Sequence, residues 1–280
     1  MFDKKLLKIE DENLVVHVNG ETDRCLIFLS GWGTPYPLAD MYQLALKFSE
    51  QYQVIILQRF GYGDSAKTLK ERTPEIIANE INSAVKQLKL ENKAITLIGH
   101  STGGLYAYIF SALYPKLCQQ VIMLDAVPLP KVLFYPNYLI VLYAKVLEKL
   151  KIIHKMSDVT LAKMINLDTQ LPNEVRKTAL EFGRKNPFNL VVTNELKPMF
   201  QSMDGLYQKY LPNDRTRIIS IVRQATYSRA KIMEKNLKHI CDYKVSNVGK
   251  SGHYIHLNHL EFVFSEIDKF LNEGESYGKR

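Results

Sequence analysis

The chain has 280 residues, 46% of them hydrophobic, which is enough to bury one large core or one core with an inserted subdomain. Its formal net charge is +8, but basic and acidic residues are interspersed without a long basic run, so we expect a solvated surface and no nucleic-acid partner. No apolar stretch approaches about 18 residues and the N-terminus is highly charged, so neither a membrane span nor a signal peptide is predicted, and these features favour a cytoplasmic protein.

Strands and helices alternate through the first half of the chain. Two extended segments at 6–9 and 14–18, joined by a polar stretch, predict a hairpin. Thr73 and Pro74 occupy the N-cap and first-residue positions of a helix whose apolar residues recur at spacings of three and four. The apolar runs that predict strands lie at 25–30, 52–58, 94–98, 120–125, 217–222 and 242–248, and further helices are predicted over 37–50 and 102–114.

Residues 126–214 interrupt this alternation. They contain no clear strand, but they contain helix-like stretches such as 138–150 and 173–183. We interpret them as a helical insertion between the first part of a core, residues 1–125, and its second part, residues 215–280. Alternating helices and apolar strands predict an α/β fold, in which a mostly parallel sheet has helices on both faces. Ligands of such sheets bind at the carboxyl ends of the strands, so we expect the chemistry there.

The three cysteines, Cys25, Cys118 and Cys241, are scattered and lack the paired spacing of a zinc site. We expect them to be reduced structural thiols. The sequence therefore predicts no metal and no cofactor, and it makes no prediction about the oligomeric state.

A candidate nucleophile follows the predicted strand at 94–98. Residues 99–103 read Gly-His-Ser-Thr-Gly, which fits the G-x-S-x-G pattern directly between a strand and a helix. A strand that reverses sharply into a helix holds Ser101 in a strained conformation, and glycine two residues to either side lets the backbones pass closely. This context favours a nucleophilic serine over a glycine-rich turn with a bystander serine.

With this motif the sequence resembles the α/β-hydrolase superfamily, over about residues 25–125 and 215–273. The loop at 30–34 reads Ser-Gly-Trp-Gly-Thr and is similar to the superfamily's His-Gly loop, which donates a backbone N–H to the oxyanion. The resemblance implies that the backbone N–H groups of Trp32 and Thr102 form the oxyanion hole. A serine replaces the usual histidine of that loop, but the donor is a main-chain group, so we expect its chemistry to be kept.

A second loop supports the resemblance. Residues 59–65 read Arg-Phe-Gly-Tyr-Gly-Asp-Ser, similar to the superfamily's R-G-x-G-x-S loop. We assign this loop a structural role, because turn chemistry explains its polar groups better than catalysis does.

A serine hydroxyl needs a neighbouring base to take its proton, and the chain has seven histidines. His253 follows the last predicted strand after a short loop that contains glycine, which is where the superfamily keeps its general base. The side chain of His100 is expected to point away from Ser101. The others are expected in the hairpin, the insertion, a helix end, or at packed or solvent-facing positions: His17, His154, His239, His256 and His259.

The third member of such a triad is a carboxylate that orients the histidine. Most superfamily members carry it after the penultimate strand, but here that strand runs into residues 223–228, and no carboxylate occurs before Glu234. A minority, including some haloalkane dehalogenases, carries it at the end of the strand after the nucleophile helix, where this chain has Asp125. Asp242 is expected a whole strand length away from His253. The alternative is that Asp125 only caps the turn that follows it.

These residues favour a serine hydrolase that cleaves small or medium apolar esters through an acyl-enzyme, with Ser101, His253 and Asp125 as its triad. Dehalogenases and epoxide hydrolases of the superfamily use an aspartate in place of the serine and are disfavoured. The insertion is expected to cap the site, and its aromatic and methionine side chains either line an acyl pocket or form its own core. Lipase, amidase, C–C hydrolase, acyltransferase and perhydrolase activities stay open, as does a binding protein that has lost turnover.

Overall fold

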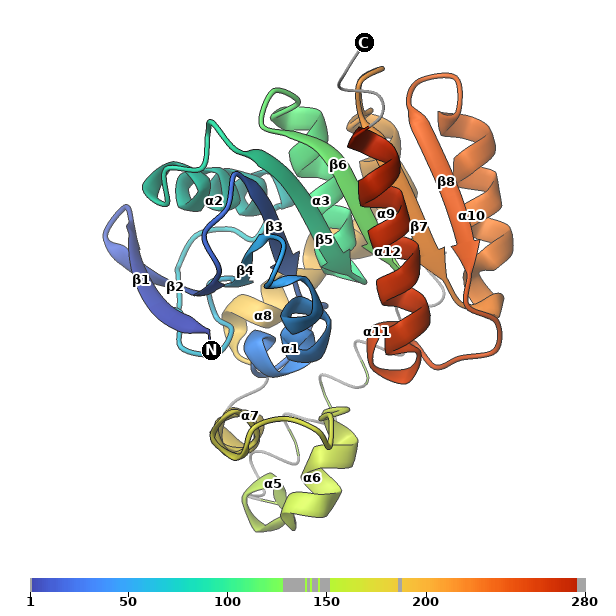
Figure 1. Ribbon diagram of the computed structural model, residues 1–280. Helices are drawn as coiled ribbons and strands as arrows, with labels where there is room; N and C mark the ends of the chain where they lie inside the picture. The colour runs from blue at the N-terminus through green and yellow to red at the C-terminus, as the bar shows by residue number, and fades with distance from the viewer. Residues whose placement is uncertain are drawn as a thin grey trace.

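Within the residues that the structure describes, eight strands form one sheet. The computed structural model describes residues 2–127, 152–185 and 188–275, together with Leu139, Leu142 and Val146. The bounds of the strands are β1 (Asp3–Ile9), β2 (Glu12–Asn19), β3 (Arg24–Leu29), β4 (Gln53–Gln58), β5 (Ala94–His100), β6 (Cys118–Leu124), β7 (Arg217–Val222) and β8 (Asp242–Asn247). Their order across the sheet is β1-β2-β4-β3-β5-β6-β7-β8 (Figure 1).

Most of the sheet is parallel. The predicted N-terminal hairpin is β1 paired antiparallel with β2, and β2 pairs antiparallel with β4. All the remaining neighbours, from β4 through β3, β5, β6 and β7 to β8, pair in parallel. The predicted α/β fold with a mostly parallel sheet is therefore confirmed. Because parallel strands end at one edge, the residues directly after β3, β5, β6 and β8 meet there.

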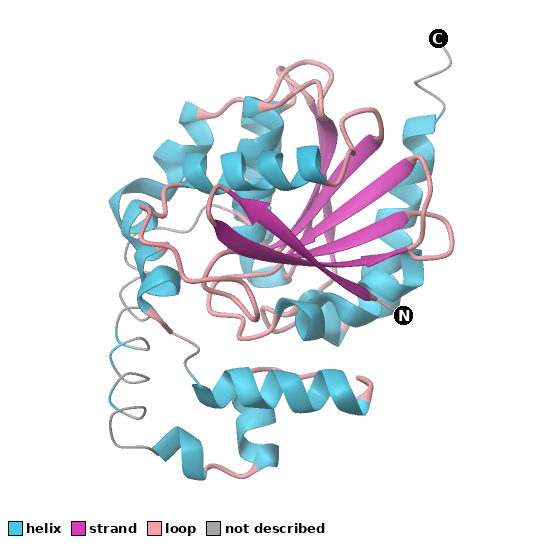
Figure 2. Ribbon diagram, turned by 90° about the vertical axis from the view of Figure 1, so that its left-hand side faces the viewer, coloured by secondary structure: helices cyan, strands magenta, loops and turns pink. Residues whose placement is uncertain are grey.

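Helices cover both faces of the sheet (Figure 2). Their bounds are α1 (Pro37–Phe48), α2 (Pro74–Gln87), α3 (Thr102–Leu113), α10 (Gln224–Leu237), α11 (Ile255–Asn258) and α12 (Leu260–Glu275). Alternate strand residues face different layers: Ile27 of β3 packs in the apolar cluster of α2, α3 and α10, whereas Phe28 packs in that of α1 and α12. The strands are thus buried on both faces, which explains their nearly continuous apolar sequence.

In the described part of residues 128–214, all regular elements are helices. They are α5 (Ile152–Lys155), α6 (Asp158–Met164), α7 (Asn173–Lys185), α8 (Leu190–Asn194) and α9 (Leu196–Lys209). Helices α5 to α7 lie together in Figure 1 and share a small apolar cluster that includes Ile153 and Leu161, and Ala179 of α7 also belongs to the cluster of α1 and α12. Val191 of α8 and Leu196 of α9 belong to the apolar cluster of α2, α3 and α10. The predicted helical stretch at 138–150 lies outside the described residues, apart from the isolated positions named above.

The cysteines Cys25, Cys118 and Cys241 are buried and unpaired. Burial raises the pKa of each thiol to about 12, so they are protonated near neutral pH. Among the described residues, no helix combines the length and the apolar character that crossing a membrane requires.

Candidate active site

Ser101 lies on a strained turn between β5 and α3. Its φ is 53° and its ψ is −119°, a conformation that residues with a side chain rarely adopt. Its N–H donates to the Leu124 carbonyl at 2.9 Å. A Cβ on Gly99 would lie 2.3 Å from the backbone of Gly103, and one on Gly103 would lie 2.2 Å from the Leu29 carbonyl oxygen. The turn therefore requires glycine at both positions, as the motif predicts.

Asp125 follows β6 directly, and its carboxylate is buried. Its φ is 46°, and its N–H donates to the Ile221 carbonyl at 2.8 Å. Thr226 Oγ1 donates to its Oδ1 at 2.5 Å, and Arg223 Nε donates to its Oδ2 at 2.8 Å. Burial acts to raise the pKa of Asp125, but hydrogen bonds from His253 and Thr226 outweigh it and lower that pKa. The carboxylate is therefore ionised near neutral pH.

His253 lies in the loop between β8 and α11. Its Nδ1 is 2.6 Å from Asp125 Oδ2. Because the ionised carboxylate can only accept, Nδ1 carries a proton, and in the neutral imidazole Nε2 is then the nitrogen that can accept one. Among the hydrogen bonds of the described residues, none joins Ser101 to His253; such contacts commonly tighten only when substrate is bound. The structure thus brings Asp125 and His253 together, with Ser101 at the end of the adjacent strand β5.

The loop after β3 passes beside the serine. A Cβ on Gly31 would lie 3.4 Å from Ser101 Cβ, so the peptide that carries the Trp32 N–H is close to the nucleophile. The Trp32 indole Nε1 donates to the Val192 carbonyl at 2.7 Å. Thr102 is the first residue of α3, and an N–H in the first turn of a helix has no acceptor within that helix. Two backbone donors therefore lie next to Ser101, on the loop and on the helix that sequence reasoning singles out.

The other carboxylates considered for the site lie elsewhere. Asp242 begins β8, at the opposite end from the His253 loop, and its Oδ2 is 3.2 Å from Arg217 Nε. Glu234 lies within α10 and pairs with Lys231. Neither is at the carboxyl edge of the sheet.

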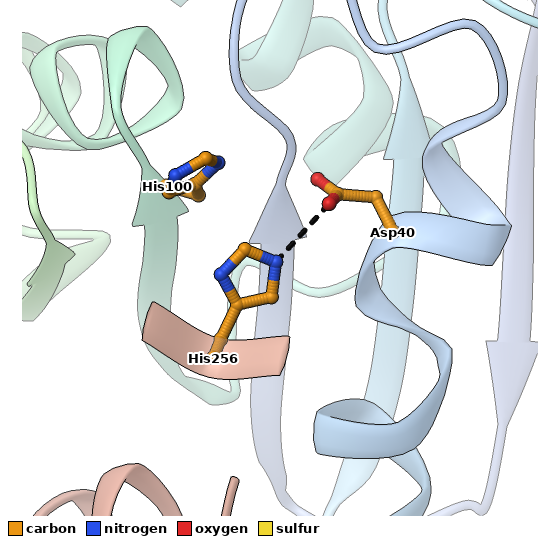
Figure 3. Close-up of side chains that lie close together, drawn as sticks. All are labelled: Asp40, His100 and His256. Atoms are coloured by element: carbon orange, nitrogen blue, oxygen red, sulfur yellow. Dashed lines mark hydrogen bonds and ion pairs between the residues drawn. The ribbon is translucent and has the colours of Figure 1, made fainter. Parts of the chain in front are cut away.

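Figure 3 shows a group of polar side chains formed by Asp40, His100 and His256, which are buried, and His100 contacts His253. His256 of α11 forms a hydrogen bond through Nε2 to Asp40 Oδ1 of α1, at 3.1 Å. The ring of His100 lies 4.6 Å from both the His253 and the His256 rings, and its Nε2 is 3.1 Å from the His253 carbonyl. Burial lowers the pKa of His100 well below its usual value, as do the neighbouring His256 and His253. His100 is therefore neutral and donates its Nε2 proton to that carbonyl.

The donor atoms of Asp40, His100 and His256 lie within 4.8 Å of one another, close enough to be tested as a metal site. Asp40 and His256 are already bonded to each other, and His100 Nε2 is engaged by the His253 carbonyl. The remaining His100 Nδ1 faces Gly31, where a Cβ would lie 3.0 Å away. This geometry suits a hydrogen-bonded support better than a metal centre. The sequence indicates only that His256 packs or faces solvent. In the structure it is buried and bonded to Asp40, and because these two residues are 216 positions apart, the sequence around His256 does not indicate this partner.

A strained strand–serine–helix turn on a mostly parallel sheet, with a bonded histidine and carboxylate at the same edge, defines the α/β-hydrolase class of fold. Residues 25–260 match the family model described as "alpha/beta hydrolase fold", and the chain belongs to this family. Membership in a hydrolase family supports an enzyme that acts on a small-molecule substrate.

Three similar proteins illustrate the range of the family. The chain is 23% identical over 239 residues to a Haemophilus influenzae protein named "Putative esterase/lipase", covering 82% of this chain and 77% of that one. It resembles the epoxide hydrolase VrEH1 of Vigna radiata with a TM-score of 0.76 at 14% identity, covering 97% and 98% of the two chains. It also resembles E-2-(acetamidomethylene)succinate hydrolase with a TM-score of 0.70 at 17% identity, covering 97% and 100%. At these identities the structural likeness establishes the fold alone.

Proposed function

We propose that the protein is a serine hydrolase that cleaves small or medium apolar carboxylic esters through an acyl-enzyme on Ser101. The observation that carries the proposal is the 2.6 Å contact between His253 Nδ1 and Asp125 Oδ2, at the edge of the sheet where Ser101 occupies its strained turn. A carboxylate so placed fixes the imidazole tautomer that a serine nucleophile needs.

The proposed reaction uses the contact between His253 Nδ1 and Asp125 Oδ2. Ser101 Oγ attacks the ester carbonyl carbon while His253 Nε2 takes the hydroxyl proton, and Asp125 stabilises the resulting imidazolium. The tetrahedral oxyanion accepts hydrogen bonds from the Trp32 and Thr102 backbone N–H groups. The C–O bond to the alcohol then breaks, and His253 returns the proton to the departing oxygen. Water repeats the sequence on the acyl-enzyme, which releases the acid and restores Ser101.

The hydrogen bonds of Asp125 bear on its proposed role as the orienting acid. The alternative is that it only caps the turn that follows it, yet its carboxylate bonds are to Arg223, Thr226 and His253. Asp125 therefore also fixes the β7–α10 junction. The two functions are compatible, because separate lone pairs of the carboxylate serve them.

The identity of residue 101 separates the proposal from the chemistry of some structural neighbours. Epoxide hydrolases of the superfamily are expected to carry an aspartate nucleophile, whereas this chain has a serine. A serine hydroxyl together with a histidine whose Nδ1 contacts a carboxylate suits acyl transfer to water.

We also propose that residues 126–214 form a cap inserted between core segments 1–125 and 215–280. Supporting this, Phe188 and Val192 contact Trp32 beside the nucleophile: the Phe188 and Trp32 ring centroids are 5.2 Å apart, and the Val192 carbonyl accepts the indole N–H. A cap at this place excludes water and limits the size of the acyl group.

Labelling with a fluorophosphonate tests the proposed function directly. The wild-type protein should label and should cleave activated esters of short and medium acids, and Ser101→Ala should do neither. A folded wild-type protein that neither labels nor cleaves any ester in such a panel would overturn the proposal.

A further inference from the structure

The loop expected to provide the oxyanion hole is held by a buried arginine. Arg59, which follows β4, is 1% exposed. Its Nη1 donates to the Ser30 carbonyl at 2.7 Å, and its Nη2 donates to the Gly31 carbonyl at 3.4 Å. The Gly31 carbonyl and the Trp32 N–H belong to one peptide unit, and in a trans peptide these two groups point in opposite directions. A donor that fixes the Gly31 carbonyl therefore also fixes the direction of the Trp32 N–H.

Arg59 is in turn oriented by Glu195, which lies between α8 and α9 and is fully buried. Arg59 Nε donates to Glu195 Oε1 at 3.4 Å, and Nη2 donates to Oε2 at 3.3 Å. The carboxylate thus binds one edge of the planar guanidinium and leaves Nη1 directed at the Ser30 carbonyl. Tyr62 OH donates to Glu195 Oε2 at 2.7 Å, which fixes the carboxylate itself.

The pair belongs to a larger buried group of charges. Arg72 Nη2 is 3.8 Å from Glu195 Oε1, and the same arginine pairs with Glu80, Nη1 to Oε1, at 2.5 Å. Two arginines and two glutamates balance one another in charge. Removing one partner of a buried pair leaves an uncompensated charge, so each of the two carboxylates stabilises the fold through its arginine. Of these two glutamates, Glu195 contacts Arg59 whereas Glu80 pairs with Arg72, so Glu80 provides a matched control for Glu195.

The segment around Glu195 contacts the same loop by other routes. Val192 accepts the Trp32 indole N–H, as described above, and Asn189 Nδ2 donates to the Gly61 carbonyl at 2.7 Å. Asn189 Oδ1 also caps α8 by accepting from the N–H groups of Val191 and Val192. Residues 188–195 are therefore joined both to the oxyanion loop and to the loop that carries Arg59.

We propose that Glu195 is a positioning residue for the reaction: through Arg59 it fixes the Gly31–Trp32 peptide so that the Trp32 N–H faces the developing oxyanion. This inference rests on the proposed function, because it assigns Glu195 a part in the same site. The proposal also gives residues 126–214 a part in forming the oxyanion hole, in addition to covering the site.

Kinetics of Glu195→Gln and Glu80→Gln on one activated ester test the proposal. Glu195→Gln should lower kcat about 100-fold, the scale of a misplaced transition-state donor, and leave KM within about threefold. Affinity for a trifluoromethyl ketone, whose adduct with the serine carries an oxyanion, should fall by a similar factor. Glu80→Gln should lower the melting temperature while keeping kcat and the ketone affinity close to wild type. Equal kinetic losses in both variants, or a loss of stability alone in Glu195→Gln, would overturn the proposal.

A second variant covers the case in which Glu195→Gln does not fold. Arg59→Lys keeps a positive charge opposite Glu195, but a single ammonium cannot reproduce the guanidinium fork to both loop carbonyls. It should show the same fall in kcat with little change in KM, and wild-type kinetics in this variant would refute the positioning role.

Hydrogen exchange separates this proposal from the proposed function. Amides of residues 30–34 should exchange faster in Glu195→Gln than in the wild type, and at the wild-type rate in Glu80→Gln. Because this measurement does not depend on turnover, a wild-type protein without esterase activity would refute the function alone. Unchanged exchange of residues 30–34 in Glu195→Gln would refute the positioning.

Discussion

Replacing Asp125 by asparagine tests the proposed triad most sharply. The substitution keeps the shape of the side chain but removes its charge and turns one acceptor oxygen into a donor NH2. In the structure, Asp125 Oδ2 accepts from both His253 Nδ1 at 2.6 Å and Arg223 Nε at 2.8 Å. An amide nitrogen at that place would face two donors. His253 would then be favoured in the tautomer with the proton on Nε2, which cannot take the proton of Ser101.

The expected loss in kcat is about 10⁴-fold, or about 5.4 kcal/mol of transition-state stabilisation. The substitution should lower the free energy of unfolding by less than it lowers transition-state stabilisation. Thr226 Oγ1 and the Arg223 backbone N–H both donate to Oδ1, and this atom remains an oxygen in asparagine. We therefore expect a folded variant with little turnover.

The assay is kcat on p-nitrophenyl acetate, with folding checked by circular dichroism. Asp242→Asn is the matched control, because that carboxylate is 43% exposed and pairs with Arg217 at the far end of β8. Its loss should change kcat less than about twofold, as expected for an exposed ion pair. Equal, mild effects of the two substitutions, or more than about a tenth of wild-type turnover in Asp125→Asn, would refute the assignment of Asp125.

Three further predictions concern stability. Gly103→Ala puts a Cβ 2.2 Å from a backbone oxygen and should lower the free energy of unfolding in urea by about 3 kcal/mol. Gly249→Ala is the control: its φ is +85° but the added Cβ meets open space, so it should lower that free energy by only about 1 kcal/mol. Equal losses in the two variants would contradict the packing argument. His256→Ala should cost about 2–4 kcal/mol, because it leaves the buried Asp40 carboxylate without this donor; an unchanged unfolding midpoint would disprove it. Because folding lowers the pKa of Asp125, its contribution to stability is present above about pH 4 and is lost as the pH falls through the folded pKa. The difference in unfolding free energy between the wild type and Asp125→Asn should therefore shrink on acidification from about pH 5 to pH 3, and a constant difference would speak against this linkage.

Much of the fold could be predicted because its signals are local. Apolar runs and their spacing predict all the strands of the sheet to within two residues at each end, apart from β1, which begins earlier. The start of α2 follows from chemistry: Thr73 Oγ1 accepts the Ile76 N–H, and Pro74 is the first helical residue. Asp125 and the His253 loop follow parallel strands, and parallel strands end at one edge of the sheet, so the sequence indicates that these two residues lie near each other.

Contacts between side chains far apart in the sequence could not be predicted in this way. Arg59 and Glu195 are separated by 136 residues, and nothing in the periodicity around either one indicates its partner. The sequence predicts a turn-forming role for the loop at residues 59–65. Ser65 has this role in the structure, because its Oγ donates to the Gln58 carbonyl. Arg59 itself donates to the Ser30 and Gly31 carbonyls and to Glu195, and these contacts are visible only in the folded chain.

The pairing of β6 with β7 has a consequence for the charges at the edge of the sheet. Leu124 pairs with Ile221, so the residues after these two strands emerge side by side. A side chain after β7 can therefore reach a side chain after β6. Arg223 follows β7, and its guanidinium binds the carboxylate of Asp125, which follows β6. The cation after β7 therefore binds the same carboxylate oxygen that accepts from His253 Nδ1, so the ends of β6, β7 and β8 are joined through one atom, Asp125 Oδ2.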